Sequence, residues 1–211
     1  MKIEITGEFR PSKIVCVGRN YAAHAKELGN EVPAEPLLFL KAPSSVVLPG
    51  GEIVLPPQSE RVEHEGELAV VIGRQAKDLT ESDDWREYVR GYACLNDVTA
   101  RDLQKKDGQF TRAKSFDTFC PIGPHIETEL ETDGLRVVTR VNGEVRQDGR
   151  TSDMVFPVGY LVRYVSQMMT LMPGDVIATG TPEGVGPLLP GDVCEVEIEG
   201  IGVLRNDVAE A

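Results

Sequence analysis

Short apolar runs rich in β-branched residues recur along the whole chain, and turn-forming residues separate them. Such runs, bounded by glycine, proline, asparagine or aspartate, are typical of β-strands. The predicted strands span residues 13–17, 37–40, 52–55, 68–72, 91–95, 136–141, 176–179 and 193–198. Helical patterns are fewer, so the chain is predicted to be mostly β (α+β) with a few short helices.

Three segments have helical features. Asn20 is expected to cap a short helix through residue 28 that Gly29 closes, since asparagine favours helix starts and glycine favours helix ends. Residues 82–88 begin with a serine followed by acidic residues, which suit the first turn of a helix. Residues 158–169 carry apolar side chains at helical spacing. The predicted buried stripe of this last helix consists of Leu161, Tyr164, Val165 and Met168.

Turn signals are spread along the chain, and no linker, repeat or low-complexity stretch divides it. The Asn142-Gly143 pair predicts a type I′ turn in a β-hairpin, because both residues tolerate positive φ. Residues 173–175 and 190–192, both Pro-Gly-Asp, predict tight turns that lead into strands. The 211 residues are expected to form one domain, with residues 1–12 as a short N-terminal lead-in.

Composition and charge narrow the classes of function. The net charge of −12 repels phosphate backbones and anionic lipids, so neither nucleic acid nor a membrane is an expected partner. No apolar run approaches transmembrane length and no signal peptide is visible, which predicts a cytoplasmic protein. The four cysteines form no CxxC pair and are expected to be reduced core residues. Only Cys120 lies in a loop-like sequence.

Residues 63–73, EHEGELAVVIG, place an acidic side chain at every second position before a strand-like apolar run. Because strand side chains alternate between faces, Glu63, Glu65 and Glu67 are expected on one face and His64 on the other. Two carboxylates about 7 Å apart on that face repel each other, and a hard cation such as Mg²⁺ or Ca²⁺ would relieve the repulsion. The alternative is a solvated strand end, which is the more common fate of a glutamate-rich run.

A third acid strengthens the metal interpretation. Asp97 follows the predicted strand at 91–95, so its carboxylate would lie at a strand end. Together with Glu65 and Glu67 it would supply three oxygens and leave positions open for water or substrate, as Mg²⁺ usually requires. Asp102 is the alternative third ligand, although Arg101 beside it could neutralise its charge.

His24 and Glu27 lie three positions apart in the short predicted helix, so their side chains are neighbours. A carboxylate that orients an imidazole ring makes the histidine suitable as a general base. A helix of this length is unstable by itself and could order as a lid when ligand binds. The alternative is an ordinary ion pair on the surface.

Cationic and anion-binding elements complete the candidate site. Lys114 stands between loop residues and an apolar run, where its ammonium could face a developing oxyanion. Residues 179–186, TGTPEGVG, form a Gly-rich loop whose N–H groups suit a carboxylate, and the loop lacks the GK[ST] ending of a P-loop. Arg19 and Arg101 are further candidates for binding an acid group.

Together these segments resemble the fumarylacetoacetate hydrolase family. The matching stretches are GRNYAAHAKELG, PLLFLKAPSSV, EHEGELAVVIG, GYACLNDVTARDLQ, KSFDTFCPIGP, VNGEVRQ and GDVIATGTPEGVG, in the family's order. The chain is similar to the short, single-domain members. The resemblance implies a mixed β-sandwich roll with a few short helices, in a homodimer that binds Mg²⁺ or Mn²⁺, with Ca²⁺ as a further option.

The resemblance also implies roles for individual residues. The implied metal ligands are Glu65, Glu67 and Asp97, and the implied catalytic residues are His24, Glu27 and Lys114. Substrate contacts are expected from Arg19, Arg101, Gln104 and Thr181, of which the last two match family positions that contact substrate or the oxyanion. A further metal-binding aspartate of the founding enzyme has no counterpart in this chain.

The activity that the resemblance implies is divalent-metal-dependent cleavage of the C–C bond of acylpyruvate-like 2-oxo acids through a metal-bound enolate. The alternative is an isomerase, tautomerase or decarboxylase that acts on 2-hydroxymuconate-type diacids or oxaloacetate through the same enolate. A third possibility is a protein that binds metal and 2-oxo acid without turnover. Product analysis separates the first two, because hydrolysis yields two fragments and isomerisation yields one.

Overall fold

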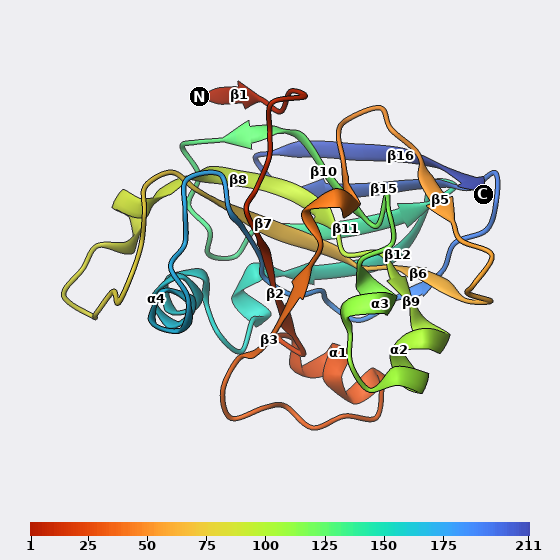
Figure 1. The fold of residues 1–211 in the computed structure, drawn as a ribbon, viewed down its shortest axis with the longest axis horizontal. Coiled ribbons are helices and arrows are strands. Elements are labelled where there is room, and N and C mark those ends of the chain that lie inside the picture. Colours follow the sequence, from red (N-terminus) through yellow and green to blue (C-terminus); the bar gives the residue numbers. More distant parts are fainter.

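The computed structural model describes residues 1–211, and its largest element is an eight-stranded mixed sheet (Figure 1). In spatial order its strands are β1 (Lys2–Glu4), β10 (Cys120–Glu127), β8 (Val89–Asn96), β7 (Gly66–Ile72), β13 (Val176–Ala178), β2 (Ile14–Gly18) and β3 (Leu37–Lys41), and β4 (Val46–Val47) pairs with β10. The strand β7, which follows the acidic run, therefore lies in the interior of this sheet.

Two smaller sheets complete the β-structure. The five-stranded sheet has the order β12 (Glu144–Arg150), β11 (Arg136–Val141), β15 (Val193–Ile198), β16 (Gly202–Glu210) and β5 (Ile53–Leu55). The three-stranded sheet has the order β14 (Gly186–Pro187), β6 (Val62–His64) and β9 (Thr99–Ala100). The prediction of a mostly β fold is confirmed.

Four short helices accompany the sheets: α1 (Ala22–Glu27), α2 (Arg101–Asp107), α3 (Thr111–Lys114) and α4 (Val158–Met168). Single 3₁₀ turns span Pro43–Ser45, Trp85–Tyr88 and Thr151–Asp153. Figure 1 shows α1, α2 and α3 gathered at one side of the molecule, with α4 apart from them. No helix combines the length and the apolar character that crossing a membrane requires.

Both faces of β7 are buried, which explains its continuous apolar sequence. Leu68 and Val70 belong to the main core cluster, which includes residues of the five-stranded sheet and α4. Ala69 and Val71 belong to a second cluster on the opposite face of the sheet. Such two-sided burial makes this strand a rigid support for the residues that precede it.

The predicted hairpin turn is confirmed, because Asn142 and Gly143 join β11 to β12 with φ of 54° and 80°. The turns predicted at 173–175 and 190–192 are also present, immediately before β13 and β15. All four cysteines are buried and free, as predicted. Cys120 opens β10 rather than lying in a loop, and burial raises the pKa of its thiol to about 12. The thiol is therefore protonated at neutral pH and suited to packing rather than to nucleophilic attack.

The predicted start of the first helix is wrong. The helix begins at Ala22, and Tyr21 rather than Asn20 is its N-cap. Asn20 instead donates from Nδ2 to the carbonyl oxygens of Phe156 and Thr179, at 3.0 and 2.7 Å. A buried amide that joins two distant segments has partners that local sequence does not reveal.

The other helix predictions need smaller corrections. In residues 82–88 only Trp85–Tyr88 are helical, as a 3₁₀ turn that Asp84 caps. In α4 the buried residues are Val158, Leu161, Val162, Val165 and Ser166. Met168, predicted to be buried, is 56% exposed. The buried face of α4 is rotated from the predicted stripe, so that it includes Val162 and Ser166 instead of Tyr164 and Met168. The prediction missed the longer elements α2, α3, β10 and β16, and the short strands β1, β4, β6, β9 and β14.

Candidate functional site

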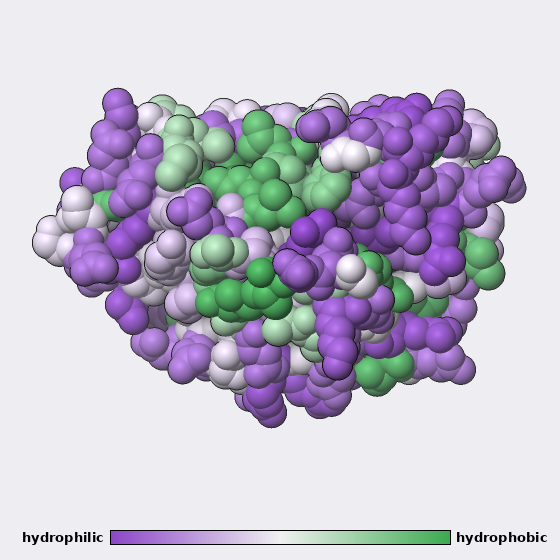
Figure 2. All heavy atoms as spheres, turned by 90° about the horizontal axis from the view of Figure 1, so that it is seen from below, coloured by the Kyte–Doolittle hydropathy of each residue, from purple (hydrophilic) through white to green (hydrophobic).

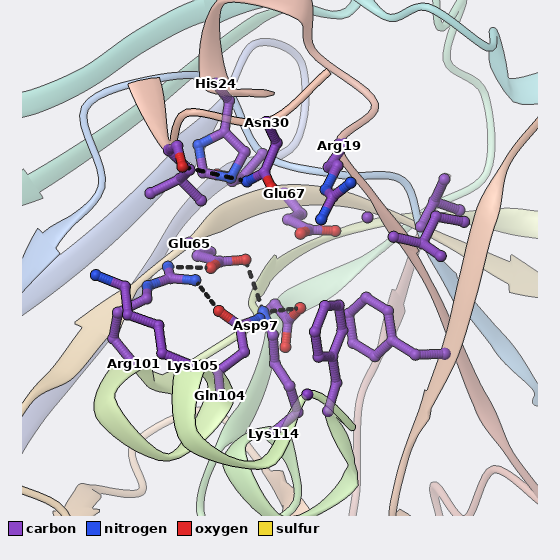
Figure 3. Close-up of a pocket in the computed structure, with 18 residues that line it drawn as sticks. Arg19, His24, Asn30, Glu65, Glu67, Asp97, Arg101, Gln104, Lys105 and Lys114 are labelled. Carbon is purple, nitrogen blue, oxygen red and sulfur yellow. Dashed lines mark hydrogen bonds and ion pairs between the residues drawn. The ribbon is translucent and has the colours of Figure 1, made fainter. Parts of the chain in front are cut away.

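A cavity of about 470 Å³ lies where β2, β3 and β7 meet α1, α2 and α3 (Figure 3). Nine of the ten predicted site residues line it: Arg19, His24, Glu65, Glu67, Asp97, Arg101, Gln104, Lys114 and Thr181. The tenth, Glu27, contacts His24 at the rim. The sequence therefore identified residues that the fold brings together.

The alternation argument assumed that the acidic run is one continuous strand, but the strand is interrupted at Glu65. Glu65 lies between β6 and β7, and its N–H donates to Asn96 Oδ1 at 2.9 Å. Its carbonyl accepts a hydrogen bond from the N–H of Asp97 at 2.8 Å. Because Gly66 pairs with Asn96 in the β7–β8 ladder, Asp97 is placed directly beside Glu65.

The carboxylates of Glu65, Glu67 and Asp97 each offer an oxygen, and these oxygens lie within 4.8 Å of one another. All three residues are at most 5% exposed. Glu63 does not join them, because its oxygens bind Arg61 and Arg101 at 2.6 and 2.7 Å. We refer to Glu65, Glu67 and Asp97 as the acidic triad.

The acidic triad is electrostatically uneven. Glu65 accepts from Lys114 Nζ at 2.7 Å and forms an ion pair with Arg101. Although burial favours its neutral form, these two cations hold the pKa of Glu65 well below its usual range. Glu67 accepts only from the N–H of Gly180, at 2.7 Å. Burial, together with the charges of Asp97 and Glu65, raises the pKa of Glu67 well above the usual value.

Two buried lysines bracket the third acid. Lys41 Nζ lies 2.6 Å from Asp97 Oδ1, and Lys114 Nζ lies 2.7 Å from Asp97 Oδ2. The sequence analysis missed Lys41, which is 1% exposed. A signal was present, because the alternation of β3 puts Lys41 on the same face as Leu37 and Phe39, and both of these line the cavity.

Lys114 does not project freely toward a ligand. Its Nζ bridges Glu65 and Asp97 and lies 5.2 Å from the ring centroid of Phe39. Burial alone would lower the pKa of Lys114, but Asp97 and Glu65 outweigh burial and raise it. The side chain is therefore a fixed ammonium beside the acidic triad.

Arg101 and Asp102, the first two residues of α2, also have partners within the chain. Arg101 donates to Glu63 Oε2 at 2.7 Å and to Gln104 Oε1 at 2.5 Å, besides its ion pair with Glu65. The guanidinium of Arg101 is therefore already paired with acids of the chain itself, whereas the sequence analysis offered it as a group that binds an acid group of a ligand. Asp102 accepts from Ser59 Oγ at 2.6 Å and neither lines the cavity nor belongs to the acidic triad, which removes it as the alternative third ligand.

The histidine and the glutamate of α1 form the predicted pair. His24 Nδ1 lies 3.2 Å from Glu27 Oε2, and Glu27 Oε1 accepts from the N–H of Gly184 at 3.0 Å. His24 is 5% exposed and lines the cavity opposite the acidic triad, as Figure 3 shows. The interpretation as an ordinary surface pair is wrong, because the imidazole is buried.

The Gly-rich loop binds carboxylates, but they belong to the chain itself. Gly180 donates to Glu67, and Gly184 donates to Glu27. Gly180 has φ of 98°, a conformation that glycine adopts without a steric penalty. Thr181 lines the cavity, but its hydroxyl donates to the carbonyl of Gly66 at 2.9 Å. The loop thus positions site residues rather than offering all its N–H groups to a ligand.

Two cations of the cavity have no acidic partner within 4.0 Å, namely Arg19 and Lys105. Arg19 has φ of 59°, which is uncommon for a residue with a side chain and is often found at functional sites. In a chain with a net charge of −12, two unpaired cations in one cavity favour an anionic ligand.

The acidic triad fits a hard divalent cation. Its donors are all carboxylate oxygens, which are the ligands that Mg²⁺ and Mn²⁺ select. Glu67 is buried with one hydrogen bond and no cation of its own, so a metal ion would supply the missing counter-charge. The specific metal does not follow from this donor set.

Comparison with known proteins agrees with the geometry. The family profile described as fumarylacetoacetate (FAA) hydrolase C-terminal matches residues 13–209. The chain is 50% identical over 203 residues to the mitochondrial oxaloacetate tautomerase FAHD1 of Arabidopsis thaliana, covering 93% of this chain and 91% of the relative.

Two solved structures are also similar. A 5-carboxymethyl-2-hydroxymuconate delta-isomerase from Mycobacterium smegmatis superposes with a TM-score of 0.89 at 50% identity, over 96% of this chain and 80% of the other. A 2-hydroxyhepta-2,4-diene-1,7-dioate isomerase from Mycobacterium marinum gives 0.88 at 48% identity, over 95% and 75%. The match across nearly the whole length shows that the chain belongs to the fumarylacetoacetate hydrolase family.

Proposed function

We propose that the protein is a divalent-metal-dependent isomerase or tautomerase of 2-oxo diacids, with oxaloacetate or a 2-hydroxymuconate-type diacid as substrate. The observation that carries this proposal is one cavity in which an oriented histidine faces the acidic triad. The similarity to proteins named as an oxaloacetate tautomerase and as hydroxymuconate-type isomerases supports this activity over hydrolysis.

Glu65, Glu67 and Asp97 would hold Mg²⁺ or Mn²⁺, and the bound ion would supply positive charge that stabilises an enolate. Three protein oxygens leave coordination positions for the substrate's own oxygens. The side chains around the acidic triad then have to move a proton and bind an anionic substrate.

His24 is the proposed proton carrier. Because the carboxylate of Glu27 can only accept, the Nδ1 atom of His24 carries the hydrogen of their contact, and in the neutral imidazole Nε2 keeps the lone pair that a base requires. Nε2 would take a proton from the carbon next to the 2-oxo group. Return of that proton from Nε2 to the 2-oxo oxygen would complete the enol and restore the neutral imidazole. The fixed ammonium of Lys114 would stabilise the negative oxygen before the proton arrives.

The two unpaired cations, Arg19 and Lys105, would explain why the protein prefers a substrate with two carboxylates. Arg19 and Lys105 lie in the same cavity as the acidic triad, so they can pair with a carboxylate at the far end of the substrate. We expect Arg19→Met to raise the KM for oxaloacetate more than the KM for a 2-oxo acid with a single carboxylate. Equal effects on both substrates would contradict the assignment of Arg19.

Hydrolysis of an acylpyruvate is the second candidate, since the family description names a hydrolase. In that reaction the same histidine would activate water for attack on the distal carbonyl. Lys114 and Gln104 would then stabilise the resulting oxyanion. The C–C bond would break to release a carboxylic acid and the enolate of pyruvate.

A single experiment separates the candidates. Enol oxaloacetate, a hydroxymuconate-type diacid and an acylpyruvate are each incubated with enzyme and Mg²⁺ or Mn²⁺, and the products are identified by NMR. The proposal expects rapid conversion into one isomeric product, with loss of activity in His24→Ala. Two fragments from the acylpyruvate, with no acceleration of the diacids, would establish hydrolysis instead. Pyruvate and carbon dioxide from oxaloacetate would establish decarboxylation.

The predicted homodimer is also part of the proposal. The strand β3 ends the eight-stranded sheet, and Leu40 on it is 46% exposed. Figure 2 shows hydrophobic residues gathered in the middle of the face seen from below, with hydrophilic residues around them. An exposed apolar side chain on an edge strand is suited to burial against a second copy. Light scattering should give twice the chain mass, and Leu40→Lys should shift the mass toward the monomer.

The cytoplasmic location predicted from the sequence stays a prediction. The plant relative is named as mitochondrial. Fractionation of the source cells, with detection of the protein by antibody, would test the location directly.

A further inference from the structure

Gln147 lies within β12, and its side chain is buried behind the wall of the cavity, with the residue 1% exposed. Its Oε1 accepts from the N–H of Gly66 at 3.0 Å and contacts His64 Nδ1 at 3.2 Å. Its Nε2 donates to Thr181 Oγ1 at 2.7 Å and to the carbonyl of Pro182 at 2.8 Å. One amide therefore joins the acidic run, the Gly-rich loop and the β11–β12 hairpin.

The chemistry of the partners fixes the direction of every bond. The carbonyl of Pro182 can only accept, so the nitrogen of the Gln147 amide must face it. The oxygen then faces the N–H of Gly66, and His64 Nδ1 must carry a hydrogen. The hydroxyl of Thr181 accepts from Gln147 and donates to the carbonyl of Gly66. Only this orientation of the Gln147 amide satisfies all four of its hydrogen-bond partners.

These hydrogen bonds hold the acidic run and the Gly-rich loop at a fixed distance from each other. Gly66 separates Glu65 from Glu67 in the chain. The loop that Gln147 holds through Thr181 and Pro182 supplies the N–H of Gly180 to Glu67. The same loop supplies the N–H of Gly184 to Glu27, which orients His24. Gln147 touches neither a metal ligand nor the cavity, yet it tethers the segments that orient Glu67 and Glu27.

We propose that Gln147 is a positioning residue that holds the Gly-rich loop against the acidic run, and so fixes both the metal-binding carboxylates and the proton-carrying histidine. The inference rests on the proposed function, because it assigns Glu67 to metal binding and His24 to proton transfer. Substitution of a residue that orients metal ligands typically lowers metal affinity or activity by about 10- to 100-fold.

The first test is Gln147→Leu, which keeps the side-chain volume but removes all four hydrogen bonds. Calorimetric titration with Mn²⁺ alone should show an affinity about 10- to 100-fold below that of the wild type. The matched control is Thr139→Val. Thr139 lies directly opposite Gln147 in the hairpin, is buried, and its hydroxyl has no hydrogen-bond partner. The control should bind Mn²⁺ as the wild type does.

Gln147→Glu distinguishes positioning from packing. An ionised carboxylate still accepts from Gly66 and His64 but cannot donate to Thr181 or Pro182, whereas the protonated acid regains one donor. The Mn²⁺ affinity of this variant, divided by that of Thr139→Val at the same pH, should therefore rise as the pH falls. The same ratio for Gln147→Leu should not change with pH.

The outcomes are distinct. Wild-type Mn²⁺ affinity in Gln147→Leu overturns the inference, as does an equal loss in Thr139→Val. If Gln147→Leu does not fold, recovery of Gln147→Glu at low pH supports the inference, and a ratio independent of pH overturns it. Absence of Mn²⁺ binding by the wild-type protein overturns the proposed metal site and this inference with it.

Discussion

The N–H of Gly184 donates to Glu27 over 3.0 Å, although the two residues are 157 positions apart in the chain. This contact fixes one carboxylate oxygen of Glu27 while the other contacts His24 Nδ1 at 3.2 Å. The Gly-rich loop thus helps to orient the proposed base, and a helix of only six residues does not have to do so alone.

Replacing Glu27 by alanine should lower kcat because the imidazole loses its orienting acceptor. The loss should be smaller than that for His24→Ala, since the base itself remains. Glu27→Gln retains an oxygen for either Gly184 or His24 and should have an intermediate effect. Steady-state kinetics with enol oxaloacetate check the order of the three variants, and a Glu27→Ala enzyme with full kcat would contradict the pairing.

His24→Ala should lower kcat by about 10²- to 10⁴-fold, the usual contribution of a positioned general base. Mn²⁺ affinity should be unchanged, because His24 is not a member of the acidic triad. Lys26→Ala on the exposed face of the same helix is the control for damage to α1. Retention of full turnover in His24→Ala would refute the base assignment.

Glu65→Gln should lower Mn²⁺ affinity steeply and destabilise the metal-free protein. The substitution removes the negative charge that Lys114 and Arg101 share, and breaking a buried ion pair costs about 3–5 kcal/mol. Calorimetric titration measures the affinity, and urea unfolding measures the free energy of unfolding. An unchanged Mn²⁺ affinity would assign the ion to other residues.

Metal binding should become tighter as the pH rises, because Glu67 must lose a proton to bind a cation. Burial and the neighbouring acids raise the pKa of Glu67 above its ordinary value of 4.5. The stability that this group contributes to the metal-free protein is therefore full below pH 4.5, and is lost as the pH rises through the raised pKa. Titrations in buffers of different ionisation enthalpy should reveal proton release on Mn²⁺ binding, and Glu67→Gln should abolish it.

Lys114→Met should tighten Mn²⁺ binding while abolishing turnover. The ammonium contacts oxygens of Glu65 and Asp97, so it competes with a metal ion for the same charge. Lys105→Met is the matched control, because Lys105 lines the same cavity without contacting the acidic triad. Weaker Mn²⁺ binding by Lys114→Met would show that the lysine supports the metal site instead of competing with it.

The sequence predicted the strands that contain apolar or β-branched runs. The strand β7 is buried on both faces, so its residues form an unbroken apolar run. By contrast, β12 has a mostly polar sequence because five of its seven residues are exposed on the surface and one of its two buried positions is Gln147. The helix α2 has no apolar stripe, since it buries only Arg101 and Leu103. Tertiary contacts determine α2, so local pattern could not predict it. The strand β12 was predicted only through the Asn142-Gly143 turn that joins it to β11.

In the site, the acidic residues could be predicted from the sequence, but their cationic partners could not. The spacing of Glu65 and Glu67, with Asp97 after the next strand, was enough to predict the acidic triad. The partners of these acids were not predictable from spacing, because Lys114 lies 49 positions from Glu65 and Lys41 lies 56 positions from Asp97. The alternation of β3 indicates the face on which Lys41 lies, but local sequence does not reveal that Asp97 is its partner.

The two-sided burial of β7 has a consequence for how the protein opens. Amides in a strand that is covered on both faces and paired along both edges exchange with solvent chiefly through global unfolding. Glu67 lies on this strand and Glu65 immediately precedes it. A ligand held there should therefore raise the melting temperature of the entire domain and slow deuterium uptake throughout its centre, instead of protecting only the neighbouring loops.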